Sequence, residues 1–217
     1  MSVSSATVRT PASVPSATIV SASSRASPLG LTAGNALEVR ESVEVLAGGG
    51  PADVVDLTVA LAVEMLAGAG RPQDEAEVRA ALCDGRAMDV WRAMISAQGG
   101  DPQAELPRAR ETEQVVADRD GVLESLDALA VGVAAWRLGA GRARKEDPVQ
   151  AGAGVELHAR PGDQVRAGQP LLTLHTDTPE RFARAQEALA GAWRVGDTAA
   201  ASGSVVLDRV DADGVTR

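Results

Sequence analysis

Apolar residues recur at helical spacing in two successive segments within residues 28–68. The first segment begins near Asn35, has Glu38 three residues later and stops at the glycines of 48–50. An asparagine followed at this distance by a glutamate predicts a capping box, in which Asn35 accepts from a free N–H of the first helical turn. The second segment begins near Asp53, and its leucine and methionine residues repeat every three or four positions. The pattern predicts two helices joined as a hairpin.

Two further helices are predicted before the pattern is interrupted. Residues 73–83 follow Pro72 and carry acidic residues in the first turn, where negative charge suits the helix dipole. Residues 99–110 contain two prolines and show no periodicity, so they are the predicted linker. Between them lies a stripe with methionine and tryptophan, which is more typical of core packing than of a cofactor pocket. The stripe consists of Ala87, Met88, Trp91, Met94 and Ile95.

In the second half of the chain the pattern changes to short alternating runs separated by turn residues. Residues 114–117 and 121–126 are predicted strands with a turn between them. A helix rich in small residues is predicted over 127–138, and residues 154–176 alternate again around two turns. A final amphipathic helix is predicted over 179–193.

The order of these elements predicts an α+β fold. A helical layer comes first, over residues 35–98, and a small mixed β-barrel with two helices follows. Residues 203–210 predict one added edge strand. The string GDQVRAGQPLLTL at 162–174 resembles one half of a biotinyl or lipoyl carrier domain, which is a flattened barrel. A carrier needs a lysine at a hairpin tip, and the one lysine of the chain, Lys145, lies far from such a tip, so only the fold analogy is kept.

Composition excludes several function classes. The 217 residues can form one large domain or two small ones. A net charge of −9 and an aromatic content of 2% oppose nucleic-acid binding, which needs clustered cations and stacking side chains. The longest apolar run, 128–136, is shorter than the roughly 18 residues of a membrane helix. Cys83 is the only cysteine, so no disulfide framework exists and we expect a reducing cytoplasm.

The first 27 residues differ from the rest of the chain. They are rich in serine, alanine and threonine, contain two prolines and no acidic residue, and predict disorder. Arg9 and Arg25 among the serines are typical of a transit peptide, but the segment has neither an amphipathic face nor a signal-type apolar core. We therefore interpret residues 1–27 as a non-native leader.

Few residues are candidates for chemistry. His158 and His175 lie in strand-like runs, where a histidine is more often structural than catalytic. Cys83 has no histidine nearby in sequence, which favours a structural cysteine over a reactive thiol. The segment GAGRARKEDP at 139–148 invites an anion-binding interpretation, because glycine N–H groups and cations can hold a phosphate. Its two acidic residues offset much of the charge and favour a solvated connecting loop.

Four strings of the sequence together carry a family resemblance. They are PLGLTAGNALEVRESVEVLAGGGPADVVDLTVALAVEMLAG (28–68), DGRAMDVWRAMISAQGGDP (84–102), ESLDALAVGVAAWRLGAGRARKEDPV (124–149) and GVELHARPGDQVRAGQPLLTLHT (154–176). In this order they resemble the thymidine and pyrimidine-nucleoside phosphorylase family, from Pro28 to about Trp193. Members of that family are considerably longer, and the residues with which they hold phosphate and base lie before the point where the resemblance begins.

The resemblance implies four parts of the chain and their roles. The expected activity is phosphorolysis, in which phosphate attacks a pyrimidine nucleoside to give a free base and a pentose 1-phosphate. We expect the C-terminal part of such an enzyme, inactive alone, with phosphate and nucleoside as partners only if the missing half is supplied. An alternative is a scaffold module that completes a split phosphorylase with a separately encoded N-terminal half. The parts are the leader (1–27), a helical remnant of the central α/β domain (28–108), a C-terminal domain with an α/β hammerhead or barrel-sandwich-like fold (109–197), and an edge strand with a frayed tail (198–217).

The resemblance also implies part of a cation site and no other cofactor. Some bacterial relatives hold a potassium-like ion through two backbone carbonyls and a glutamate, which correspond here to Leu29, Thr32 and Glu41. Oxygen ligands suit a hard cation. The remaining ligands would come from the missing loop, and the alternative for Glu41 is an exposed helix carboxylate. Family dimers form largely through the N-terminal helical domain, so dimerisation is not carried over to this chain.

Overall fold

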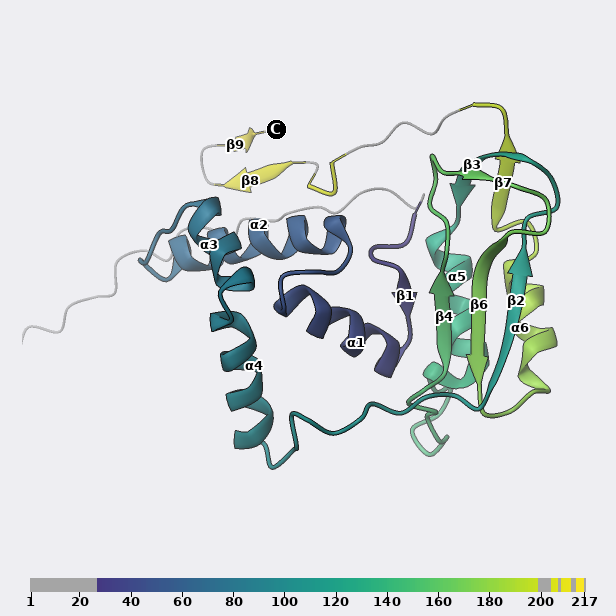
Figure 1. Cartoon of the computed structure of the whole chain (residues 1–217), viewed down its shortest axis with the longest axis horizontal. Coiled ribbons are helices and arrows are strands. Elements are labelled where there is room, and N and C mark those ends of the chain that lie inside the picture. Colours follow the sequence, from purple (N-terminus) through teal and green to yellow (C-terminus); the bar gives the residue numbers. More distant parts are fainter. Residues whose placement is uncertain (1–26, 199–203, 207, 212–213, 217) are drawn as a thin grey trace, which may run out of the picture.

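The computed structural model describes residues 27–198, 204–206, 208–211 and 214–216. Four helices form one side of the molecule in Figure 1. An extended segment then leads from the end of the fourth helix to the strands on the other side (Figure 1). The helices are α1 (Asn35–Leu46), α2 (Ala52–Gly68), α3 (Glu75–Cys83) and α4 (Arg86–Ala97).

The capping box predicted at Asn35 is wrong. The cap residue of α1 is Gly34, whose φ of 148° favours glycine, and its N–H donates to Glu38 Oε1 at 2.9 Å. The Asn35 side chain instead donates to the carbonyl of Ala140 at 2.7 Å, so it binds a distant segment of the chain and does not cap α1. Helix α3 begins at Glu75, two residues after its predicted start, because Asp74 is the cap residue and its Oδ1 accepts from the N–H of Glu77.

The strands form antiparallel sheets. A four-stranded sheet has the order β1-β4-β6-β2, and a three-stranded sheet has the order β5-β3-β7. The predicted strands 114–117 and 121–126 flank a turn but enter different sheets, as β2 and β3. The strands are β1 (Thr32–Ala33), β2 (Glu111–Val116), β3 (Gly121–Leu126), β4 (Gly154–Leu157), β5 (Gln164–Val165), β6 (Pro170–Thr176) and β7 (Trp193–Gly196), with a separate hairpin of β8 (Arg209–Asp211) and β9 (Gly214–Thr216).

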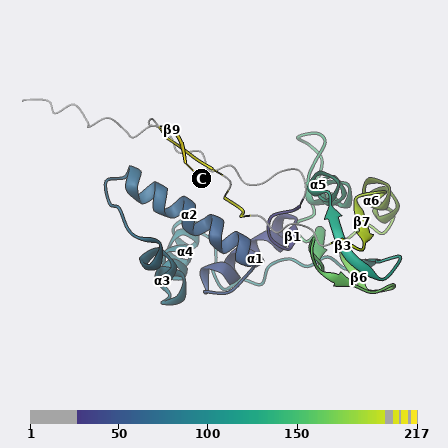
Figure 2. The ribbon, with the colours of Figure 1, turned by 90° about the horizontal axis from the view of Figure 1, so that it is seen from above.

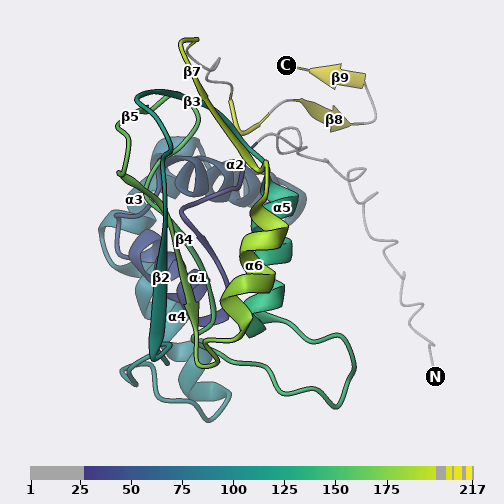
Figure 3. The same ribbon diagram turned by 90° about the vertical axis from the view of Figure 1, so that its right-hand side faces the viewer.

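The main core lies in the β2–β7 region. Two helices, α5 (Ala128–Ala135) and α6 (Arg181–Leu189), lie side by side against the sheets (Figure 3). A short π-helix, η1 (Trp136–Ala140), continues α5. Apolar residues from the helices and from β3–β7 are buried in one cluster, against which Val115 of β2 packs, and Leu172 and Leu174 of β6 are 0% exposed. Small side chains on α5, such as Ala134, allow this close packing.

The helical side is joined to this core by β1. Thr32 and Ala33 pair with β4, and the N–H of Ala36 donates to the carbonyl of Ala151. Seen from above, α1–α4 and the β2–β7 region lie on opposite sides of this connection (Figure 2). None of the described helices combines the length and apolar character needed to cross a membrane.

The structure confirms the expected fold class and limits two other expectations. The α+β fold is confirmed, but the closed barrel is not, since the strands described between residues 111 and 196 lie in two antiparallel sheets. The stripe on α4 is a core face only in part: Met88 is buried, whereas Met94 is 46% exposed. The edge strand predicted over 203–210 falls partly outside the described residues, as does nearly all of the predicted leader. The predicted division near residue 108 stays a prediction.

Candidate functional site

The predicted cation residues gather around the segment before α1. Glu41 of α1 faces this segment, and its Oε2 accepts from the N–H of Leu31 at 2.7 Å. Gly30 has a φ of 70°, and an added Cβ would lie 2.3 Å from Glu41 Oε1, so only glycine fits beside this carboxylate. Leu29 is 44% exposed, and Thr32 lies in β1. The Glu41 carboxylate therefore contacts the segment in which the other two predicted residues lie.

A second carboxylate fixes the same segment from α2. Asp53 Oδ2 accepts from the N–H of Gly30 at 3.1 Å. The same side chain forms an ion pair with Arg160, whose two terminal nitrogens each lie 3.0 Å from a carboxylate oxygen of Asp53. Because Arg160 follows β4, this bidentate pair ties the helical side to the sheet.

Burial raises the pKa of Glu41, and the hydrogen bond from Leu31 opposes that shift. A nearby cation would stabilise such a carboxylate in its charged form. A cavity of about 220 Å³ beside it is lined by Thr32, Glu41 and Glu156 among others, and the Thr32 hydroxyl is buried beside the Glu41 carboxylate. These features fit one part of an oxygen-lined site. Among the described residues, no three histidine, cysteine or acidic side chains cluster as metal ligands.

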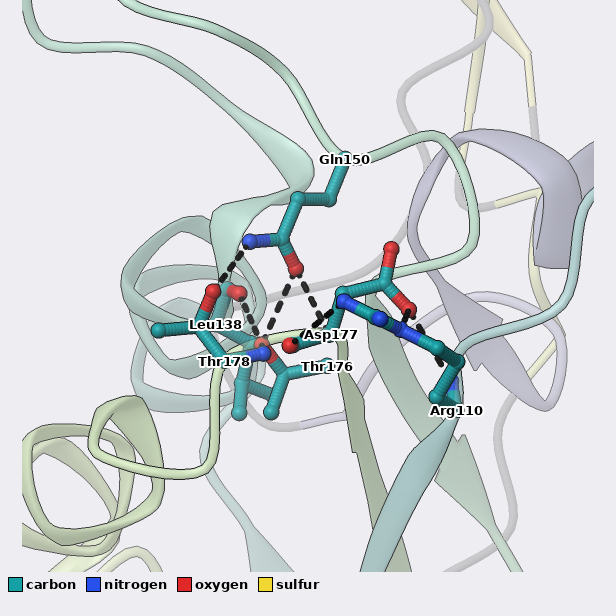
Figure 4. Close-up of polar contacts among 6 residues, drawn as sticks. All are labelled: Arg110, Leu138, Gln150, Thr176, Asp177 and Thr178. Carbon is teal, nitrogen blue, oxygen red and sulfur yellow. Dashed lines mark hydrogen bonds and ion pairs between the residues drawn. The ribbon is translucent and has the colours of Figure 1, made fainter.

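Gln150 closes the loop that carries the arginines of the GAGRARKEDP segment (Figure 4). Its Nε2 donates to Thr178 Oγ1 at 2.8 Å, and its Oε1 accepts from the N–H of Asp177 at 2.8 Å. Its own N–H donates to the carbonyl of Gly139 at 2.9 Å, so both ends of the loop are held together. The buried hydroxyl of Thr176 donates to the carbonyl of Leu138 at 2.7 Å. We call Leu138, Gln150, Thr176 and Thr178 the polar clamp.

Arg110 joins the linker to the same region (Figure 4). Its N–H donates to Asp177 Oδ1 at 2.9 Å, and its guanidinium group donates to the Asp177 carbonyl. Inside the loop, Asp147 Oδ2 accepts from the N–H of Arg144, so one acidic residue of the segment folds the loop itself. The loop is therefore anchored at its base and ordered by internal contacts.

The two histidines each lie beside a side chain of the neighbouring strand or loop. His158 Nε2 lies 2.6 Å from Thr173 Oγ1, which gives it a structural hydrogen bond. His175 Nε2 lies 3.4 Å from Glu156 Oε2, and burial lowers the pKa of His175 although Glu156 opposes that shift. A neutral histidine in β6 fits the structural interpretation. Cys83 ends α3 and is exposed.

Comparison with known proteins identifies the C-terminal region. Residues 122–196, from β3 to β7, match the pyrimidine nucleoside phosphorylase C-terminal domain. These residues form a pyrimidine nucleoside phosphorylase C-terminal domain. The chain is 52% identical over 184 residues to thymidine phosphorylase of Mycobacterium tuberculosis. The aligned residues make up 84% of this chain and 42% of that protein.

Two other relatives extend this comparison. Pyrimidine-nucleoside phosphorylase of Staphylococcus epidermidis is 36% identical over 162 residues, or 70% of this chain and 37% of that protein. Human thymidine phosphorylase is 38% identical over 190 residues, or 79% of this chain and 39% of that protein. The chain thus spans about two fifths of the length of these relatives. Since 84% of the chain aligns with the mycobacterial protein, the match includes helices before the C-terminal domain.

Sequence reasoning missed the clamp and the arginines of the helices. Gln150 and Thr176 are 26 residues apart in sequence and meet only because η1, the loop and β6 converge. Arg137 Nη1 donates to the carbonyl of Arg184, which lies 47 residues away in sequence. The one local signal was the spacing of Arg181 and Arg184, which places both on one side of a helix.

Proposed function

We propose that this chain supplies the C-terminal part of an enzyme that phosphorolyses thymidine or related pyrimidine nucleosides. In that reaction a phosphate oxygen forms a bond to the anomeric carbon, the bond from that carbon to the base nitrogen breaks, and the free base leaves with a proton. The match of β3–β7 to the phosphorylase C-terminal domain carries this proposal. The names of the relatives supply the substrate class.

The chain alone is expected to be inactive. Phosphorolysis requires donors and cations positioned around a phosphate dianion and a departing base. The predicted candidates do not provide them together, since His158 is hydrogen bonded to Thr173 and His175 lies beside Glu156. The chain spans two fifths of its relatives' length, so the proposed role is to complete a site built largely by other residues.

The test is phosphate-dependent release of thymine from thymidine. The purified chain is assayed alone and after mixing with a separately expressed N-terminal portion of the mycobacterial relative, and the intact relative is the positive control. We expect no turnover by the chain alone and turnover in the mixture. Turnover by the chain alone at the rate of the intact relative would contradict the proposal, and a parallel assay with uridine establishes base preference.

A second candidate function is a binding module that completes a split phosphorylase. The observation that favours it is a set of exposed apolar side chains on the helical side: in the described part of the chain, Leu61 and Met65 of α2 are 40% and 73% exposed, and Val90 and Met94 of α4 are 71% and 46% exposed. Such side chains commonly lie at interfaces. A stable complex with the N-terminal portion by light scattering, lost in the Met65→Glu variant, supports this role. A complex unaffected by that variant would contradict it.

We also propose a potassium ion at Leu29, Thr32 and Glu41, held by two carbonyls and the carboxylate. The partly buried carboxylate of Glu41, whose pKa is raised by burial, supports the assignment. Bound cation should raise the melting temperature more in potassium than in sodium chloride, and Glu41→Gln should remove that difference. We propose a cytoplasmic protein, and the two packed sheets support a barrel-sandwich-like C-terminal fold.

A further inference from the structure

Four arginines surround a cavity beside the loop that the polar clamp anchors. The cavity holds about 320 Å³ and lies between η1, the loop after it and the start of α6. We call its charged and aromatic lining the arginine pocket: Trp136, Arg137, Arg142, Asp147, Arg181 and Arg184. The residues come from three segments that are adjacent only in the folded chain.

The charge of the pocket opposes that of the whole chain. Four guanidinium groups line it against one carboxylate, Asp147, although the chain carries a net charge of −9. Glu187 pairs with Arg137 at 3.4 Å from outside the lining, which still leaves an excess of two positive charges. Like charges held close together repel one another, so an anion in the cavity would be stabilised.

Several donors in the pocket have no partner among the described residues. Arg137 Nε is buried and makes no hydrogen bond, although its Nη1 donates to the carbonyl of Arg184 at 2.6 Å. Within the part of the chain that the structure describes, the guanidinium groups of Arg181, which is partly buried, and of Arg184, which is exposed, make neither hydrogen bonds nor ion pairs. A buried donor without an acceptor, such as Arg137 Nε, is rare, because it loses its hydration without compensation.

The walls of the pocket are held in place before any ligand binds. Gly139 has a φ of 118°, and an added Cβ would lie 2.7 Å from Arg181 Nη1, so glycine allows the arginine to approach the backbone. Arg142 Nη1 donates to the carbonyl of Lys145, which orients one side of the loop. Trp136 is 41% exposed beside these groups. These contacts hold one side of the pocket in place, which lowers the entropic cost of ordering the loop on binding.

We propose that the arginine pocket binds a phosphate group, carried either by inorganic phosphate or by a small sugar phosphate. Guanidinium groups bind phosphate oxygens through paired charge-assisted hydrogen bonds, and the free groups of Arg181 and Arg184 are the principal donors. The buried Nε of Arg137 supplies a third. This inference does not rest on phosphorolysis, because binding is measured without turnover.

Trp136 provides the reporter for the test. Trp91→Phe and Trp193→Phe remove the other tryptophans, and the remaining fluorescence is titrated with sodium phosphate and, separately, with ribose 5-phosphate. Chloride at matched ionic strength is the control. We expect a saturable change with phosphate that chloride does not reproduce. Tighter binding of ribose 5-phosphate would assign the pocket to a sugar phosphate, and equal or weaker binding would assign it to inorganic phosphate.

Two arginine variants test the assignment. Arg181→Gln and Arg184→Gln should each weaken phosphate binding about tenfold, the loss expected for one charge-assisted hydrogen bond. Arg71→Gln removes an exposed charge from outside the pocket and should leave binding unchanged. Circular dichroism and isothermal titration of the same variants verify folding and binding independently of the fluorophore. Binding that is absent in the parent protein, or equally strong in Arg181→Gln and Arg184→Gln, would overturn the proposal.

Discussion

The helices α1–α4 and the β2–β7 region bury very different amounts of apolar surface. Among the described residues, six apolar side chains before the linker are buried, and twenty are buried after it. In α2, which is 17 residues long, only Val59 is buried. The β2–β7 region closes a core of its own, whereas the helical side depends on β1, Asp53 and Arg160 for its position. The comparison shows that a helical pattern of apolar residues predicts a helix but does not ensure that its apolar face is buried.

Core truncation should separate the two regions most strongly. Leu172→Ala removes a fully buried side chain from β6 and should cost about 3–5 kcal/mol of unfolding free energy. Leu82→Ala in α3 should cost about 2 kcal/mol of unfolding free energy, because fewer buried side chains surround Leu82 and they can relax into the space it leaves. Leu129→Ala, at a side chain that is 75% exposed, is the control and should change stability by less than about 0.5 kcal/mol. Urea denaturation measures all three, and equal costs for Leu172→Ala and Leu82→Ala would remove the contrast.

The polar clamp should be the next most sensitive feature. Gln150→Ala leaves the N–H of Asp177 and the hydroxyl of Thr178 without their partner and should cost about 1–3 kcal/mol. Gln150→Glu keeps an acceptor for the Asp177 N–H and should be intermediate. Gln103→Ala, in the exposed linker, is the matched control. Hydrogen exchange should show faster exchange of the amides at both ends of the loop in Gln150→Ala, and unchanged exchange would mean that the clamp does not anchor the loop.

The Asp53–Arg160 pair should have a smaller effect, confined to the junction. The two side chains are 22% and 32% exposed, so solvent screens the pair in part. Asp53→Asn should cost about 1 kcal/mol, and a double-mutant cycle with Arg160→Gln isolates the pair. Asp56→Asn, which breaks the exposed pair with Arg79, should change stability by less than about 0.5 kcal/mol. A coupling energy of zero would show that the pair does not hold the helical side to the sheet.

The smallest expected effect is a dependence on pH through His175. Burial lowers its pKa in the folded protein below the ordinary value of 6.5, so the unfolded chain binds the proton more tightly. Its contribution to stability is complete above pH 6.5 and is lost as the pH falls toward the lowered pKa. His175→Gln should flatten that part of the stability curve, and His158→Gln is the comparison variant. The same slope in parent and His175→Gln would exclude His175 as its source.

Local pattern predicted the helices well, because their signals lie within the elements. Asp74 and Asp127 each accept from N–H groups of the first turn that follows them, and α5 and α6 lie within the predicted ranges. Asn35 failed as a cap because its side chain binds Ala140, which is 105 residues away. Strand β7 was missed: the predicted helix ended at Trp193, the first residue of the strand, and no element was predicted for residues 194–196.

The pairing between strands could not be predicted from the sequence. The turn between β2 and β3 is visible in the sequence, but their partners β6 and β7 are set by contacts across the whole domain. The candidate site divides in the same way. Glu41 was predicted through family resemblance, and its role in a cation site stays a prediction, whereas the arginine pocket forms only when α6 packs beside η1 and the loop.

Limited proteolysis of the intact chain tests most directly whether the β2–β7 region is an independently folded domain. Loss of structure begins where the fewest buried contacts hold the chain, so the exposed segment of residues 98–110 should be cut early. We expect a resistant fragment that begins in this segment and contains β2–β7, identified by mass spectrometry, while α1–α4 are digested. A resistant fragment that contains α1–α4, with β2–β7 digested, would contradict it.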